Sequence, residues 1–410
     1  MNILIICKYA STELEGIETR IISIAKKFSS NHNANVTLVS SDSNIGAVFK
    51  KYKRIYNFEE ISNINIIRIK TLKYFKTTSF RRILSWIDFE IKVFLMPRKY
   101  YKNPDVIIVS SLSLLTILNG YLLKKIYNAK LIFEIRDIWP LYLTVEMNFF
   151  KYNPIIILLA FIEKFGYKNA DLIIGTMPNL KNHISSTYNI RDKKIDCIPF
   201  GFDEKIIYSS NINDDKFITR DILGIPSNAF LIGFAGSMGI GNGLNTIFEV
   251  IPKFANREDI YFLFMGDGML KDNYVKICKN FKNVIFLPKV IGRAKVAQVL
   301  SISDIVYFAS LNSKFWDYGW SPNKIIDYMM AGKPILASYS GFLTMLNEAD
   351  CGYVVKAEDP IALFEILNNL LFIEKNELVE KGLNGRKWLI ENRSYSTLAN
   401  SYYSLLEKII

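Results

Sequence analysis

Short runs rich in Ile and Val alternate with longer amphipathic stretches along most of the chain, and this alternation limits the possible folds most. Such alternation is typical of parallel sheets in which a helix follows each strand. The strands expected in the first half are NILIIC, NVTLVS, PDVIIVSS, AKLIFEIRD, ADLIIGT and KIDCIPFG. Those expected in the second half are FLIGFAGS, IYFLFMGDG, NVIFLPKV, SDIVYFASL, GKPILAS and GYVVKA. We therefore predict an α/β protein with doubly wound parallel sheets.

The alternation breaks once, between Gly201 and Ser227, where acidic and polar residues gather without a strong helical or strand periodicity. A chain of 410 residues, 50% of them hydrophobic, is too long for one ordinary domain. We predict two Rossmann-like domains of similar size, residues 1–205 and 206–393, followed by an amphipathic C-terminal helix over 394–410.

The net charge of +12 is dispersed along the chain, so an anionic substrate or membrane surface explains it as well as nucleic acid does. No DNA- or RNA-recognition motif is present, and we expect no nucleic-acid partner. The four cysteines form no CxxC pair, which favours buried thiols over a metal site or disulfides. With only two histidines, zinc chemistry and Ser-His-Asp hydrolysis lack their usual residues.

The first residues, MNILIICKYA, fit a buried strand better than a signal peptide, because Lys8 interrupts a short apolar run. We expect a cytoplasmic protein without a transmembrane anchor. The segment Leu72 to Asp105 mixes Lys and Arg with aromatic residues. It fits either an anionic membrane interface or an ordinary amphipathic helix pair, and the sequence does not decide between them.

The stretch SPNKIIDYMMAGKPIL reads as one short helix. Ser321 suits the N-cap, Pro322 the first helical position, and Gly332 a left-handed residue after the helix end. Lys324 then lies in the first turn, where a cation costs about 0.3–1 kcal/mol against the helix dipole. An anion docked on this helix end would explain the lysine, and Asp327, one turn deeper, could bind a sugar diol. The alternative is a surface Lys–Asp pair.

Helical spacing also predicts which side chains of this helix are buried. Tyr328 should share a face with Lys324 and Asp327. The expected buried face is Ile325, Ile326, Met329 and Met330.

Two other stretches could carry chemistry. FAGSMGIGNGLNTI places glycines in a strand-to-helix turn, where backbone N–H groups could approach a phosphate, although a merely flexible turn remains the alternative. FEIRDIWP places Glu134, Arg136 and Asp137 at the carboxyl end of an expected parallel strand, where ligands gather in open α/β sheets. A structural Arg–Asp pair is the alternative there.

In order and spacing, these motifs resemble the retaining glycosyltransferases of family 4, which have the GT-B fold of two Rossmann-like domains facing a cleft. In detail the sequence is similar to the bacterial subgroup that adds N-acetylated, often deoxy, sugars to O-antigen or capsule repeat units. The resemblance implies a hexosyltransferase that takes its sugar from a UDP-linked donor. It further implies that the anomeric configuration of the sugar is retained and that the enzyme needs neither metal nor cofactor. It also implies a C-terminal helix that packs on the first domain. The implied acceptor is a polyprenyl-diphosphate-linked saccharide, and the implied location is the cytoplasmic face of the plasma membrane, in peripheral contact with anionic lipid.

The resemblance also assigns residues. The first domain would bind the acceptor and the second the donor, with Asp327 on the ribose. The implied catalytic residues are Arg136, Asp137 and Lys324. The implied donor-binding residues are Gly16, Gly236, Ser237, Gly239, Asn242, Gly243, Lys289, Arg293, Ser321, Pro322, Asn323 and Asp327.

Four positions depart from the family pattern, in three ways. The ribose carboxylate is Asp327 instead of Glu, and Gly319 stands where the family has an earlier Glu. Ser237 and Asn242 occupy the positions of an Arg and a Lys beside the glycine turn, so the diphosphate needs another cation. We expect Lys324 to supply it. The other candidate cations are Lys289, Arg293 and Arg136.

Other functions fit less well. A UDP-sugar 2-epimerase would share the two-domain architecture but needs a histidine near the sugar, and neither His32 nor His183 is near an expected strand end. A nicotinamide dehydrogenase would need GxGxxG after the first strand. A non-catalytic membrane-binding module leaves the second half unexplained.

Overall fold

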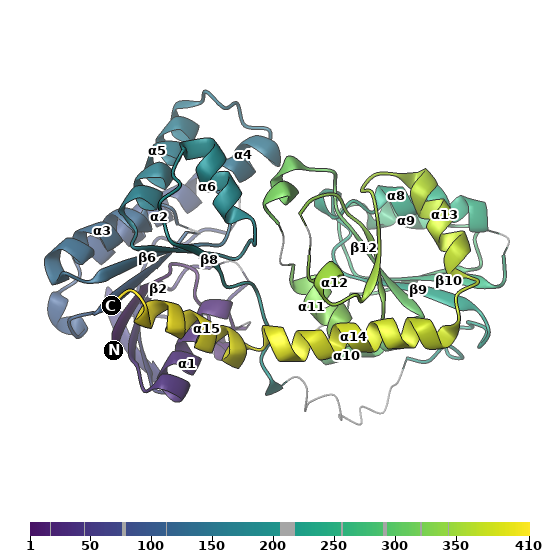
Figure 1. The fold of residues 1–410 in the computed structure, drawn as a ribbon, viewed down its shortest axis with the longest axis horizontal. Helices are drawn as coiled ribbons and strands as arrows, with labels where there is room; N and C mark the ends of the chain where they lie inside the picture. The colour runs from purple at the N-terminus through teal and green to yellow at the C-terminus, as the bar shows by residue number, and fades with distance from the viewer. Residues whose placement is uncertain are drawn as a thin grey trace. The chain divides into compact units, whose positions relative to one another are not determined.

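The computed structural model describes residues 1–16, 18–44, 46–75, 79–111, 113–205, 218–255, 257–289, 293–319, 322–342 and 344–410, except the side chains of 293–295. Contacts divide the chain into two compact units. The first unit is Met1–Gly201 with Tyr395–Ile410, and the second is Phe202–Ser394 (Figure 1). Most of the linker expected from the sequence, residues 206–217, lies outside the described residues.

The first unit contains an eight-stranded sheet in the order β3-β4-β2-β1-β5-β6-β7-β8. All neighbouring strands are parallel except β3 and β4, which pair antiparallel. The strands are β1 (Asn2–Ile6), β2 (Asn35–Ser41), β3 (Tyr56–Ile61), β4 (Ile64–Ile69), β5 (Val106–Ser110), β6 (Lys130–Ile135), β7 (Leu172–Gly175) and β8 (Ile195–Cys197).

The hairpin of β3 and β4 is absent from the sequence prediction. Ser62 and Asn63 close it with φ values of 50° and 62°. Such positive angles are those of a tight two-residue hairpin turn, which usually carries Asn-Gly or Asp-Gly. Without a glycine, the turn gave no recognisable sequence signal.

Helices cover both faces of the first sheet. On one face, α1 (Arg20–His32) packs against the C-terminal helix α15 (Tyr395–Glu407), with the Tyr402 ring centroid 5.4 Å from that of Phe28. The expected return of the C-terminal helix to the first domain is thus present. On the other face, α3 (Thr116–Tyr127) contacts both α2 (Phe80–Phe94) and α5 (Pro154–Asn169) (Figure 1). The remaining helices of this unit are η1 (Glu13–Glu15), η2 (Arg98–Tyr100), α4 (Leu141–Val145) and α6 (Leu180–Tyr188).

The second unit contains a six-stranded, all-parallel sheet in the order β11-β10-β9-β12-β13-β14. Every strand expected in this half is present. The strands are β9 (Phe230–Ala235), β10 (Ile260–Met265), β11 (Val284–Leu287), β12 (Ile305–Ala309), β13 (Ile335–Ser338) and β14 (Gly352–Val355). This strand order is the Rossmann order, and the two α/β units together have the GT-B fold that the sequence predicted.

Helices also surround the second sheet. α8 (Asn245–Val250) contacts α13 (Pro360–Leu370), and α11 (Asn323–Met330) contacts α10 (Arg293–Ser301) and α14 (Lys375–Arg393). The other helices among the described residues of this unit are η3 (Ile240–Asn242), η4 (Ile251–Phe254), α9 (Lys271–Ile277), η5 (Lys314–Tyr318) and α12 (Met345–Glu348). The core between α8, α13 and the sheet is rich in Phe and Ile, as the apolar strand runs require.

Candidate functional site

The strand order of the second sheet reverses between β9 and β12. In open α/β sheets, ligands bind outside the carboxyl ends of the strands at such a switch point. The glycine turn, residues 236–243, follows β9, and Ser310 follows β12. The turn therefore lies where this topology favours a ligand.

The glycines of this turn differ in what their surroundings require. A Cβ on Gly243, whose φ is +60°, would lie 2.5 Å from the backbone of Ser310, and a Cβ on Gly236 would lie 2.6 Å from Cε of Lys324. A Cβ on Gly241 would meet nothing within 4 Å. Close packing against backbone thus requires glycine at 243, which a merely flexible turn would not, whereas the contact at 236 is with the flexible end of a side chain.

The neighbouring loop after β10 fits tightly against the same turn. A Cβ on Gly268 would lie 2.6 Å from the backbone of Met238. Backbone N–H groups of the turn donate to this loop, from Gly236 to Met265 O at 2.9 Å and from Met238 to Asp267 O at 2.8 Å. These two N–H groups already have acceptors, so the turn offers a phosphate fewer backbone donors than its glycine content suggests.

Lys324 lies directly against the glycine turn. Its Nζ donates a hydrogen bond to Oδ1 of Asn242 and lies 5.1 Å from the ring centroid of Phe234. Burial lowers the pKa of Lys324 to about 8. The structure therefore brings the helix lysine and the glycine turn together, and Asn242, which stands where the resemblance would put a lysine, is the residue that Lys324 contacts.

The start of α11 differs by one residue from the sequence prediction. The helix begins at Asn323 with Pro322 as its N-cap, so Lys324 is the second helical residue instead of the third. Ser321, the expected N-cap, lies outside the described residues. Gly332 has a φ of +67° just after the helix, which confirms the expected left-handed ending. Asn323 is exposed and Pro322 half-buried at the helix N-terminus.

The prediction that Tyr328 lies outside the buried face of α11 is wrong. Its side chain is fully buried, and its hydroxyl donates to Ala235 O at 2.9 Å and accepts from Ala235 N at 3.2 Å. These bonds to the end of β9 satisfy the hydroxyl, so the ring can enter the core. Met330, expected to be buried, is half-buried, as is Asp327. Tyr328 thus fixes α11 to the strand that precedes the glycine turn, a role that helical spacing did not reveal.

The remaining donor-side candidates are less closely connected to the turn. Ser237 is exposed within it, and Gly239 would tolerate a Cβ at ordinary contact distance. Lys289 is exposed after β11, two strands away from β9. Arg293 begins α10, and its side chain lies outside the described part of the chain.

Lys271 is a cation of this region that the sequence analysis missed. Its Nζ donates to Gly266 O at 2.8 Å and to Leu287 O at 3.2 Å. It therefore joins the loops after β10 and β11. A lysine in an ordinary amphipathic stretch gives no sign of such a role.

In the first unit, Arg136 and Asp137 follow β6 at the carboxyl edge of the sheet. The backbone N of Arg136 donates to Ser111 Oγ at 3.0 Å, and Thr176 Oγ1 donates to Arg136 O at 3.0 Å. The Arg136 guanidinium lies 5.5 Å from the Phe200 ring centroid, and its buried Nε has no hydrogen-bond partner among the described residues. Burial raises the pKa of Asp137, and Arg136 opposes this shift.

Glu134, the third candidate of this stretch, lies in a buried ion pair. Its fully buried carboxylate pairs with Arg20 of α1. Arg20 also donates to the backbone carbonyls of Ile198 and Pro199. A buried charge needs such a partner, and this one lies far away in the sequence.

Gly16 ends η1 in the loop after β1, with a φ of +127° that favours glycine. Its nearest neighbour would be Gly46 O, 3.3 Å from an added Cβ. Lys8, just after the same strand, is buried and donates to Ser85 Oγ at 3.0 Å. Burial lowers the pKa of Lys8 to about 7.

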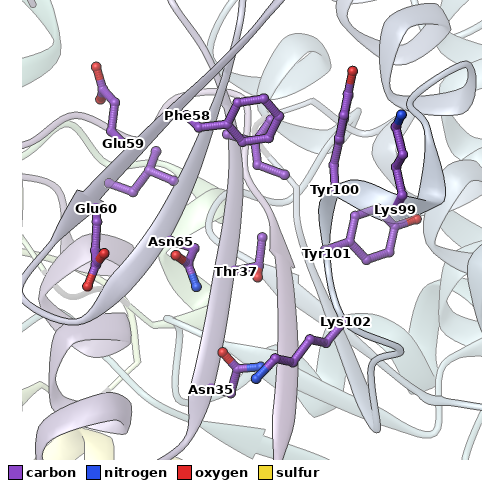
Figure 2. A pocket seen from close by; sticks show the side chains of 12 residues that line it. Asn35, Thr37, Phe58, Glu59, Glu60, Asn65, Lys99, Tyr100, Tyr101 and Lys102 are labelled. Carbon is purple, nitrogen blue, oxygen red and sulfur yellow. The ribbon is translucent and has the colours of Figure 1, made fainter.

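A separate depression of about 490 Å³ lies in the first unit, between β2, β3 and β4 and the segment around η2 (Figure 2). Tyr100 and Phe58 stand close together in it, with ring centroids 4.8 Å apart. None of the site residues expected from the sequence lines it. Within the described ranges, no three His, Cys, Asp or Glu side chains gather so that they could hold a metal ion.

Comparisons with known proteins give a family match within the second unit. Residues 229–372 match the family model "Glycosyl transferases group 1". An uncharacterized glycosyltransferase of Methanocaldococcus jannaschii is 23% identical over 197 residues, which cover 46% of this chain and 47% of that protein. The match therefore spans about half the length of this curated relative.

Solved structures match over the whole chain. They include sucrose-phosphate synthase from Thermosynechococcus elongatus, with a TM-score of 0.69, 15% identity and coverage of 100% of this chain and 98% of the other. Anabaena HepE in complex with UDP and glucose matches with a TM-score of 0.63 and 15% identity, and the match covers 100% of both chains. A glycosyltransferase from Rickettsia africae matches with a TM-score of 0.63 and 16% identity, and the match covers 100% of this chain and 98% of the other. At these identities, the likeness establishes the fold.

Proposed function

We propose that this protein is a retaining glycosyltransferase that transfers a sugar from a UDP-linked donor to a lipid-linked saccharide. The position of Lys324 carries this proposal. Its ammonium group lies against the glycine turn at the switch point of the second sheet, within the segment that matches the glycosyltransferase family model. A half-buried cation at this position suits the diphosphate of a nucleotide sugar.

The donor would bind with its diphosphate between the glycine turn and the N-terminus of α11. The helix dipole and Lys324 then act on the same anion, which removes the conflict between the lysine and the dipole. Asp327 would accept hydrogen bonds from the ribose diol. Anabaena HepE, which shares the fold, has been solved in complex with UDP and glucose, and this favours a uridine nucleotide here.

The proposed reaction breaks the bond between the sugar and the UDP oxygen and forms a bond to the acceptor oxygen on the same face of the sugar. The leaving phosphate takes the acceptor proton, so the step needs no side-chain base and, as we propose, neither metal nor cofactor. Lys324 stabilises the negative charge that develops on UDP. Arg136 and Asp137 are proposed to act on the acceptor side, from the first unit.

The finer substrate assignments follow from the sequence resemblance. We expect an N-acetylated hexosamine or deoxyhexosamine as the transferred sugar and a polyprenyl-diphosphate-linked saccharide of O-antigen or capsule biosynthesis as the acceptor. Such an acceptor lies at the cytoplasmic face of the plasma membrane, where the protein would bind peripherally.

Two measurements test the function. Thermal unfolding of the purified protein with UDP, ADP and GDP should show the largest stabilisation with UDP. Incubation with UDP-N-acetylhexosamines should release UDP only when a polyprenyl-diphosphate-linked saccharide is added. Interconversion of the UDP-sugars without acceptor would instead identify an epimerase.

The contacts of the two histidines do not favour the epimerase. The His32 ring stacks on Tyr403, with centroids 3.9 Å apart. His183 is buried with its ring 6.3 Å from Tyr167, and its Nε2 lies 3.5 Å from Glu163 Oε1. Both histidines thus have packing roles in the first unit.

A further inference from the structure

Helix α2 is apolar on two opposite faces. One face, with Ser85, Phe89 and Val93, is buried. The other face is exposed to solvent, although a helix on the surface of a soluble domain normally carries polar residues there. The exposed apolar side chains repeat at helical spacing, and they are Phe80, Ile83, Leu84, Ile87, Ile91 and Phe94.

The two helices in the same layer continue this surface. On α3, Leu118, Leu122 and Ile126 are exposed at intervals of one turn. On α5, Ile155, Ile157 and Leu158 of the first two turns are exposed, and Phe161 is 68% exposed. The loop before α5 adds Phe150, which is 69% exposed. Large apolar side chains therefore lie on the outer side of all three helices.

These helices are neighbours, because α3 contacts both α2 and α5 (Figure 1). They cover the face of the first sheet opposite α1 and α15. Soluble monomers rarely expose a contiguous apolar patch of more than a few hundred Å², and larger patches mark partner or membrane surfaces. We call the outer surface of α2, α3, α5 and the loop 147–153 the apolar layer.

The charges on the apolar layer have one sign. Neither α2, α3 nor α5 carries an exposed acidic side chain: Glu90 and Glu163 are buried, and Asp88 is half-buried in an ion pair with Lys92 at 2.7 Å. The basic residues on or beside these helices are mostly exposed, and they include Arg81, Arg82, Lys125, Lys151, Lys164 and Lys168. An apolar surface with only basic charge complements a surface that is apolar inside and anionic at its boundary.

We propose that the apolar layer docks on an anionic lipid bilayer. Its aromatic and aliphatic side chains would enter the boundary between headgroups and acyl chains, while the bases contact lipid phosphates. No helix in the described part of the chain is both long and apolar enough to cross a bilayer, so this contact is interfacial. The sequence suggested a possible membrane contact only for Leu72 to Asp105, and the proposed surface also includes α3 and α5. Only the presence of a lipid-linked acceptor in that membrane rests on the proposed function.

Vesicle co-sedimentation of the full-length protein tests this contact. Vesicles of phosphatidylcholine with phosphatidylglycerol should bind the protein, and vesicles of phosphatidylcholine alone should bind it more weakly. The double variant Phe150→Glu, Phe161→Glu should lower the partition coefficient by about tenfold or more, because it removes two large apolar groups and adds two negative charges. Both positions are exposed, so the fold should be kept.

Phe372→Glu is the matched control, because Phe372 is 87% exposed but belongs to the second unit. This variant should bind vesicles like the wild type. Equal vesicle binding by the double variant would overturn the proposal. So would a dimer of the wild type in light scattering that the double variant dissociates, because a second copy would then cover the apolar layer.

The UDP-induced thermal shift separates this inference from the proposed function. The double variant should keep that shift while it loses vesicle binding. A wild type that binds vesicles but shows no response to UDP would contradict the proposed function and leave the membrane contact supported.

Discussion

At the scale of the residue, Lys324 shows how tertiary contacts change the meaning of a local pattern. In the sequence it is a cation in the unfavourable first turn of a helix. In the structure its ammonium group lies against the glycine turn, with Asn242 as acceptor and the Phe234 ring nearby. Partial burial of a cation costs free energy unless a charged partner offsets it. An anionic ligand at this point would offset that cost, which is why Lys324 marks the proposed diphosphate site.

Replacing Lys324 by Ala should lower turnover by about 10²–10³, because the leaving UDP loses its cation. The wild-type affinity for UDP should fall as the pH rises above about 8, since the pKa of Lys324 lies near that value and only its protonated form attracts the diphosphate. In the Lys324→Ala variant this pH dependence should disappear. Steady-state kinetics and UDP titrations from about pH 6.5 to about pH 9.5, roughly 1.5 units on either side of the pKa of Lys324, measure both effects.

Lys333→Ala is a suitable control, because Lys333 is a half-buried lysine just after the opposite end of α11 whose pKa burial also lowers. Its turnover and pH profile should match the wild type. An unchanged rate in Lys324→Ala would remove Lys324 from the proposed mechanism.

At the scale of the element, the glycine turn acts as a tightly packed piece of backbone. Its position is set by contacts with the loops after β10 and β12, and Tyr328 fixes α11 beside it. Three strand ends and one helix therefore hold the proposed donor site. The individual glycines contribute unequally, which gives a test within a single turn.

Gly243→Ala should lower both stability and affinity for UDP. The added Cβ would meet the backbone of Ser310 at 2.5 Å, and the φ of +60° is unfavourable for Ala. We expect a loss of about 1–3 kcal/mol in the free energy of unfolding. Gly241→Ala, two residues earlier in open space, should change it by less than about 0.5 kcal/mol. Chemical denaturation and UDP titration compare the two variants, and similar losses in both would contradict this account of the turn.

At the scale of the whole molecule, the chain is not divided in simple sequence order. The last residues, Tyr395–Ile410, belong to the first unit, where α15 buries Leu398, Tyr402 and Leu406 against the core of α1 and the sheet. The first unit is thus completed only by the C-terminus.

Deletion of residues 395–410 should destabilise the first unit selectively. Several large side chains would lose their buried contacts, at about 1.5–3 kcal/mol each, so we expect a loss on the order of 5 kcal/mol. Differential scanning calorimetry should show an earlier transition for the first unit, while the UDP-dependent shift of the second unit remains. Deletion of only 408–410, which are largely exposed, is the control. Equal effects of the two deletions would show that α15 contributes little.

The sequence by itself determined the local structure of the protein. Ile- and Val-rich runs became strands, the six strands of the second half among them, and SPNKIIDYMMAGKPIL became a helix that ends at a left-handed Gly332. It also pointed to the glycine turn and to the glycosyltransferase resemblance. These features depend on periodicity and on turn residues, which are written locally in the chain. The β3–β4 hairpin escaped prediction because its turn lacks that local signal.

Only the tertiary structure decided which of these residues meet. Glu134, a site candidate in the sequence, has Arg20, 114 positions away, as its buried partner. Lys324 and Asn242, 82 positions apart, meet because β9 and β12 are neighbours at the switch point of the second sheet. The apolar layer also became visible only when one face of α2 was seen to be buried. Long-range contacts depend on strand order and on which helix faces the sheet covers, and the sequence does not encode these locally.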